Sequence, residues 1–300
     1  MLNQGQATIP GEWYWYGNGF RRIGITLHLA TILPGGFLVC FQFVPVIRHK
    51  LLIFHRINGY VIIVLFFISM AGVFMITRHA VGGPPNTQAA IGTLATVTII
   101  SISLAYYNIK RLQIDQHRAW MIRTWVYAGS IISVRLIMMA ANKVVYAMKD
   151  YYAVVACDVI FNDYAILGIP DAGNPTYLLY PQCATGNGTA EGRVVVHVDP
   201  TAGPETAAAA FQLTFGMSVW IALIIHAIGV EIYLNLTPAE SERLRVVSYQ
   251  CQLEAGFKNP GSAGLTVDRF GDAPRWHPSH QNGSLEELRV PRKSGRVTEE

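Results

Sequence analysis

The sequence predicts an all-α integral membrane protein, a bundle of five transmembrane helices. Three observations lead to this prediction. Hydrophobic residues make up 51% of the chain and charged residues only 14%, whereas soluble proteins carry about 25% charged residues. The apolar residues fall into five blocks, each near the roughly 20 residues that a lipid bilayer core requires. Basic residues gather at the ends of these blocks, and the net charge is only +4, so we expect no nucleic-acid partner.

Five predicted spans follow from these blocks, and the first four form a core. The spans cover residues 23–47, 51–77, 89–107, 120–147 and 207–234. We therefore expect a four-helix membrane core (residues 21–147), a long loop (residues 148–206) and a fifth transmembrane helix (residues 207–235). Pro34 lies inside the first span, where it should kink the helix, and neighbouring helices can satisfy the backbone groups that a proline frees.

The two ends of the chain lie outside the predicted spans. Residues 1–20 are polar and aromatic, and their run Trp13-Tyr14-Trp15-Tyr16 is typical of the interface between membrane and water. Residues 236–300 are rich in proline, glycine, serine and charged residues, with few aliphatic ones. Such a segment buries too little apolar surface to fold by itself. We therefore expect a mostly disordered tail.

The charge of the connections predicts how the chain crosses the membrane. The first connection carries Arg48, Lys50 and Arg56, and the third carries Lys110 and Arg111. The second and fourth connections lack such an excess of basic residues. Because basic loops stay in the cytosol, the tail should be cytosolic, and the N-terminus and the long loop should be extracytosolic. This topology fits an integral membrane protein of the secretory pathway, in the endoplasmic reticulum or plasma membrane.

The long loop has the features of a segment in an oxidising compartment. Cys157 and Cys183 form a natural pair for a disulfide there. Asn187 begins an Asn-Gly-Thr sequon, which predicts glycosylation on the same side of the membrane. Further sequons at Asn235 and Asn282 fall on the predicted cytosolic side and should stay unmodified.

One charged residue, Arg135, lies inside the fourth predicted span. At 3.6 residues per turn it shares a seam with His117 and Asn142. A charge in the hydrocarbon region costs at least ~2.5 kcal/mol, so we expect an anionic or polar partner. No aspartate is embedded in a span, and Glu231 sits at the opposite end of the fifth helix. The partner would be a cofactor carboxylate, a substrate anion or a set of backbone carbonyls.

Histidines beside arginine open two of the predicted spans, at His55 and His117. Neutral imidazole is a common axial ligand of haem, and arginine pairs with carboxylates such as haem propionates. The pattern thus suggests a haem b. Its residues would be the metal ligands His55 and His117, an outer ligand or proton relay at His28, and the anion partners Arg118, Arg123 and Arg135. The alternative, equally compatible with the sequence, is that His55 and His117 are ordinary interfacial histidines beside the arginines of cytosolic loops.

Several of these residues also carry a resemblance to a known family. The matching features are Leu27-His28, the run from His55 to Tyr60, the run from His117 to Arg123, and Arg135. Over roughly residues 23–140 the chain resembles the predicted membrane proteins of domain-of-unknown-function family 2306, found in bacteria and fungi. The resemblance implies a four-helix membrane core with His28, His55, His117 and Arg135 as its marked positions, and no established reaction.

The resemblance has two further implications for function. A weaker similarity, in helix number and histidine placement, links the chain to transmembrane b-type cytochromes, although matched histidine pairs on two adjacent helices are not clear. The long cysteine-bearing loop and the fifth helix resemble fungal versions of the family. Such fungal proteins can be encoded beside secondary-metabolite pathways, which favours a function without redox chemistry.

Three functional hypotheses follow. The first is a haem-b-binding membrane oxidoreductase that accepts electrons from a donor. The second is a haem-free membrane enzyme of cyclase or isomerase type, or an accessory membrane protein, in a fungal secondary-metabolite pathway. In that enzyme His28, Arg135 and Asn142 would carry acid/base catalysis on a hydrophobic small molecule. The third is a transporter or scaffold, which the missing inverted repeat disfavours.

Overall fold

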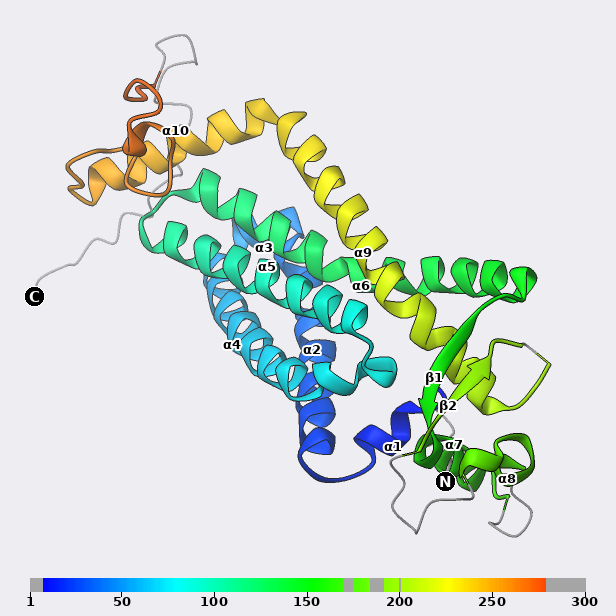
Figure 1. The fold of residues 1–300 in the computed structure, drawn as a ribbon. Helices are drawn as coiled ribbons and strands as arrows, with labels where there is room; N and C mark the ends of the chain where they lie inside the picture. Colours follow the sequence, from blue (N-terminus) through cyan, green and yellow to red (C-terminus); the bar gives the residue numbers. More distant parts are fainter. Residues whose placement is uncertain (1–7, 170–174, 184–191, 200, 279–300) are drawn as a thin grey trace, which may run out of the picture. The chain divides into compact units, whose positions relative to one another are not determined.

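The fold is described by a computed structural model, which covers residues 8–169, 175–183, 192–199 and 201–278 (Figure 1). The chain divides into two compact units. The first, here called the membrane unit, holds the residues up to Ile102 and Ile122–Ile232. The second, here called the C-terminal unit, holds Ser103–Met121 and the residues from Tyr233 onward. Each unit is described by itself.

Five helices are long and apolar enough to cross a membrane, which confirms the predicted multi-pass architecture. They are α2 (Gly19–Gln42), α4 (Leu52–Ile76), α5 (Pro85–Lys110), α6 (Ile114–Met148) and α9 (Pro204–Asn235) (Figure 1). Each matches one predicted span within a few residues at most of its ends. Helix α2 continues through Pro34. Several elements begin with proline, which suits the first turn of a helix because its missing N–H would be unpaired there anyway.

Helices α2 and α4 pack closely because glycines meet where they cross. A side chain at Gly72 would collide with the backbone of α2 at Gly24 and His28. The His28 ring lies on the same side of α2, with Nδ1 2.8 Å from the Ser69 hydroxyl of α4. Further along, the Asn58 amide donates to the Leu38 carbonyl at 3.0 Å. The small and polar face of α2 is therefore a helix–helix contact, as its sequence pattern suggests.

The connection between α6 and α9 folds into a small domain, here called the disulfide cap (residues 149–203). Its elements are β1 (Tyr152–Ala156), α7 (Cys157–Ile166), α8 (Thr176–Leu179), the 3₁₀ turn η4 (Pro181–Cys183) and β2 (Arg193–His197). The strands are antiparallel, with Val154 opposite Val195. Alternate residues of each strand face a core that also includes Ile160 and Tyr164 of α7.

The predicted disulfide is present and closes the cap. Cys157 at the start of α7 is bonded to Cys183 at the end of η4, across 26 positions of sequence. The predicted glycosylation site at Asn187 lies outside the described residues, so glycosylation stays a prediction. The cap is otherwise more structured than the simple long loop that the sequence predicted.

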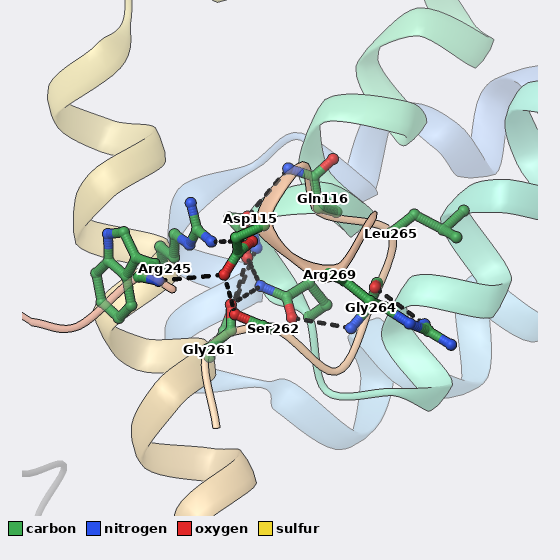
Figure 2. Close-up of polar contacts among 12 residues, drawn as sticks. Asp115, Gln116, Arg245, Gly261, Ser262, Gly264, Leu265 and Arg269 are labelled. Carbon is green, nitrogen blue, oxygen red and sulfur yellow. Dashed lines mark hydrogen bonds and ion pairs between the residues drawn. The ribbon is translucent and has the colours of Figure 1, made fainter. Parts of the chain in front are cut away.

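The C-terminal unit corrects the prediction of a disordered tail. Residues 238–254 form helix α10 (Pro238–Glu254), and the chain from residue 255 to 278 folds against it, with a 3₁₀ turn η5 at Asp268–Phe270. Buried amides hold this fold where aliphatic residues are few (Figure 2). Gln113, Gln252 and Asn108 are fully buried and bond to the segment 261–265. Composition alone misses such a network, and residues 279–300 lie outside the described chain.

Candidate functional site

A short N-terminal helix, α1 (Glu12–Tyr16), carries an acid that the sequence analysis did not select. Helix α1 contacts α2, α7 and the 3₁₀ turn η2 (Thr77–Gly82). The Glu12 carboxylate accepts a hydrogen bond from the Val81 N–H of η2, and the charge of Arg135 acts on it from α6. Arg135 therefore lies within electrostatic range of a carboxyl group of the chain. We call Glu12, Tyr16, the Val81 N–H and Arg135 the Glu12 site.

The backbone at Val81 is unusual and serves this contact. Val81 is buried and has φ 46° and ψ 56°, in the left-handed region that a β-branched residue rarely adopts. Such a conformation costs of order 1–3 kcal/mol and persists only where the surroundings enforce it. Here it accompanies the hydrogen bond from the Val81 N–H to Glu12. Strain of this kind is concentrated at functional sites, which supports a role for the Glu12 site beyond packing.

The surroundings of Glu12 shift the pKa of its carboxyl group. Burial raises the pKa of Glu12, and the Arg135 charge and the Val81 N–H offset only part of this effect. The neighbouring Tyr16 is 6% exposed, and burial together with the Glu12 charge raises the pKa of Tyr16. Its phenol thus remains a proton donor. A carboxyl group of raised pKa beside a cation and a phenol is an arrangement suited to general acid catalysis.

Aromatic packing holds α1 in place beside this site. The Trp15 ring stacks on the His79 ring of η2 with centroids 4.2 Å apart. The Arg21 guanidinium of α2 lies over the Trp15 ring, 5.2 Å from its centre. Part of the aromatic run expected at the membrane interface is therefore packed against the protein itself.

Two of the predicted catalytic residues make contacts elsewhere in the membrane unit. The Asn142 carbonyl oxygen accepts a hydrogen bond from the Thr214 hydroxyl at 2.6 Å, which joins α6 to α9. His28 bonds to Ser69 between α2 and α4. Neither contact involves Glu12. Of the three predicted catalytic residues, Arg135 is the one that the structure brings to the Glu12 site.

The residues predicted to bind haem are distributed over both units. In the membrane unit, the His55 carbonyl accepts a hydrogen bond from Gln42. In the C-terminal unit, His117 Nδ1 lies 2.9 Å from the Ala105 carbonyl, and Arg118 lies 3.3 Å from the Tyr233 hydroxyl. A backbone bond at Nδ1 fixes the tautomer that presents Nε2, as in many metal-binding histidines.

The arginine predicted as a propionate partner already pairs with a protein carboxylate. Arg123 binds Glu231 through two contacts, Nε to Oε1 at 2.6 Å and Nη2 to Oε2 at 2.9 Å. His226 lies in the membrane unit, as Arg123 and Glu231 do. Both of its ring nitrogens are bonded, one to Ser133 and the other to the Val126 carbonyl. Among the described residues no group of three or more metal-binding side chains occurs. Haem binding by His55 and His117 stays a prediction.

Sequence reasoning missed Glu12 for an identifiable reason. Glu12 stands outside every apolar span, and its partner Arg135 lies more than a hundred positions away. One signal was available, because Glu12 is an acid that directly precedes four aromatic residues at a predicted membrane boundary. A charge in such a position is a candidate partner for an otherwise unpaired charge within a span.

Comparisons with known proteins agree with the resemblance inferred from the motifs. Residues 25–164 match the model of the family described as predicted membrane protein (DUF2306). Over 302 aligned positions the chain is 24% identical to the Ava biosynthesis cluster protein G of Aspergillus versicolor, an alignment that covers 84% of this chain and 86% of the relative. No solved structure matches.

Proposed function

We propose that this multi-pass membrane protein is an enzyme of a fungal biosynthetic pathway, and that it isomerises or cyclises a hydrophobic intermediate by acid/base catalysis at the Glu12 site. The observation that carries the proposal is the half-buried Glu12, which accepts the N–H of the strained Val81 and lies within electrostatic range of Arg135. The relative named for a biosynthesis cluster supports the kind of pathway. A site next to membrane spans suits an apolar substrate.

The mechanism uses the raised pKa of Glu12. Protonated Glu12 donates its proton to the substrate, which generates a cationic or enol-type intermediate at the site of protonation. The carboxylate left on Glu12 is stabilised at that moment by Arg135 and by the Val81 N–H, which are already in place before the reaction. The rearranged substrate then returns a proton to Glu12, so no external oxidant or reductant is consumed.

The test is replacement of Glu12 in the producing organism. A strain lacking the gene is complemented with the wild type, with Glu12→Gln, or with the control Glu240→Gln, whose carboxylate lies exposed on α10. Glu12→Gln keeps the Val81 N–H contact but has no acidic proton. We expect the product to fall about 100-fold or more with Glu12→Gln and to stay unchanged with Glu240→Gln. The accumulated precursor should have the molecular formula of the missing product.

Other outcomes would contradict the proposal in distinct ways. Full production by Glu12→Gln would exclude a chemical role for this acid. A precursor that differs from the product by a pair of hydrogens would indicate redox chemistry. An accessory membrane protein would give a different result: every variant of the site would lower the yield by the same amount, and the set of metabolites would stay unchanged.

A haem-binding redox protein is the second candidate, favoured by the bond between His117 Nδ1 and the Ala105 carbonyl, a kind of contact that orients many metal-binding histidines. It predicts a reducible b-type absorbance spectrum in the detergent-purified protein, lost in His117→Ala and in His55→Ala. A flat spectrum from protein that retains the Cys157–Cys183 disulfide would exclude this candidate.

A further inference from the structure

A second pair of acids is buried at the base of the disulfide cap. Asp163 of α7 is 5% exposed, and Glu205, in the first turn of α9, is 1% exposed. The charge of Glu205 acts on Asp163. Among the described residues neither acid takes part in an ion pair. Two like charges are thus held together, out of water, without a cation to balance them.

The hydrogen bonds of these acids leave one oxygen of each unpaired. Asp163 Oδ1 accepts the Gly11 N–H at 2.9 Å. Glu205 accepts hydrogen bonds from the hydroxyls of Tyr164 and Tyr180. Asp163 Oδ2 and Glu205 Oε2 are buried without a hydrogen-bond partner in the described chain. A buried, unpaired carboxylate oxygen is costly unless a ligand neutralises it.

We propose that Asp163, buried beside Glu205, is a proton-binding site, and that its proton fastens α1 to the disulfide cap. One proton removes the repulsion between the acids, as in other carboxyl pairs. The packing around Glu205 is close, because a Cβ at Gly203 would overlap the Glu205 carboxylate and the Tyr164 hydroxyl.

The groups around Asp163 shift its pKa. Burial, with the Glu205 charge as a smaller contribution, raises the pKa of Asp163 to about 6, against the lowering effect of the Gly11 N–H. Burial and Glu205 also raise the pKa of Tyr180 to about 12 and that of Tyr164, so both phenols remain donors. Asp158, on the same helix, bonds to Tyr14 instead.

Protonation of Asp163 makes the packing of α1 depend on the pH. Asp163 holds the Gly11 N–H, and Gly11 directly precedes Glu12. Gly11 has φ 85°, which a residue with a side chain rarely adopts. Loss of the proton leaves a charged Asp163 buried near Glu205, which favours an open α1 that admits water, although the Gly11 N–H by itself favours the charged form. If the proposed function holds, acidic surroundings therefore favour the ordered Glu12 site.

The sign of the effect on stability follows from the raised pKa. The folded protein keeps a proton that the unfolded chain releases near pH 3.8, the ordinary value for aspartate. The stabilisation is therefore full below that pH and is lost as the pH rises through about 6. An exposed or ion-paired aspartate shows no such loss.

The test measures thermal unfolding of the full-length protein in detergent, by tryptophan fluorescence, between about pH 4.5 and pH 7.5. We expect the melting temperature of the wild type to fall as the pH rises. Asp163→Asn keeps the acceptor for Gly11 and cannot ionise, so its melting temperature should be nearly independent of pH and should exceed the wild type at neutral pH. The matched control Asp158→Asn, on the same helix, should keep the wild-type pH profile.

Further measurements keep the proposal open to contradiction. If Asp163→Asn does not fold, Glu205→Gln removes the repulsion and should make the fall of the melting temperature with pH shallower, while the larger effect of burial on Asp163 remains. Hydrogen exchange of the amides in α1 should speed up at neutral pH more in the wild type than in the folded variant. Identical pH profiles for the wild type and the variants would overturn the proposal, and so would full protection at neutral pH by added Ca²⁺, which would indicate a metal site. Glu12→Gln removes the contribution of Glu12, whose pKa is also raised, but should keep the part of the profile that Asp163→Asn removes, which separates this proposal from the proposed function.

Discussion

The disulfide cap and the C-terminal unit both bury polar side chains, but the buried amides of the C-terminal unit, Asn108, Gln113 and Gln252, are bonded at both their oxygen and their nitrogen. Gln113 bonds to Asp115, Gln252 and the backbone of Gly261 and Gly264 (Figure 2). Asp115 in turn accepts from Gln116 and Ser248. In the disulfide cap, by contrast, Asp163 and Glu205 each keep an unpaired oxygen.

Paired polar groups stabilise the fold, whereas unpaired acids make its stability depend on pH. A fully paired network gains nothing by taking up a proton or a ligand, and it makes the fold unique. An unpaired acid is destabilising at neutral pH and stabilised by protonation. The Arg123–Glu231 ion pair, in which each side chain has its partner, is of the first kind. Glu12, whose pKa is raised by burial, is of the second kind.

The largest expected effect comes from breaking the paired network. Gln252→Met, similar in size, leaves the Arg111 carbonyl and the Gly261 N–H without their partner and removes one of the hydrogen bonds of Gln113. Each buried group left unpaired costs about 1–3 kcal/mol, so we expect the C-terminal unit to lose about 4 kcal/mol. Faster proteolysis and hydrogen exchange of residues 255–278 would measure this loss. Gln116→Met, which removes a single bond, is the control, and equal effects of both variants would contradict the role of pairing.

A smaller effect is expected at the ion pair that anchors the last turn. Asp268 is 1% exposed in its side chain and binds Arg245 at 2.8 Å. Burial alone would raise the pKa of Asp268, but hydrogen bonds from Ser262, Thr266 and the Trp276 N–H, with the Arg245 charge, lower it. Arg245→Met should therefore cost about 2 kcal/mol in unfolding free energy.

The pH dependence of this second acid sharpens the comparison. Because the pKa of Asp268 is lowered, its stabilisation is present above the ordinary value of 3.8 and is lost as the pH falls below it. Asp163 behaves in the opposite way, since its contribution is lost as the pH rises. Hydrogen exchange resolved by segment should show acidification from neutral pH to about pH 5 protecting α1 and α7 while leaving residues 255–278 unchanged. The same trend in both segments would contradict this contrast.

The smallest effect is expected at a surface pair. Arg243 and Glu240 lie one turn apart on α10, 2.7 Å from each other and partly exposed. Such pairs contribute about 0.5 kcal/mol or less. Thermal unfolding of Glu240→Gln should therefore differ little from the wild type, and a large loss would show that exposure is a poor guide to which polar contacts matter.

Local features of the sequence were enough to predict the membrane architecture. Runs of apolar residues predicted all five spans, and Cys157 and Cys183 predicted the disulfide, because both depend on composition and compartment. The proximity of Glu12 to the Arg135 charge was not predicted, since it depends on packing between segments distant in the sequence. The order of residues 238–278 was missed because amides, which leave no hydropathy signal, hold them.

The measurement that tests the proposed acid/base role most directly is conversion of the accumulated precursor by microsomes in D₂O. Because the Glu12 carboxyl proton exchanges with solvent, we expect an isomeric product that carries deuterium, formed by the wild type and by Glu240→Gln but not by Glu12→Gln. A product formed equally well by Glu12→Gln, or one without solvent deuterium at the site of protonation, would contradict general acid catalysis by Glu12.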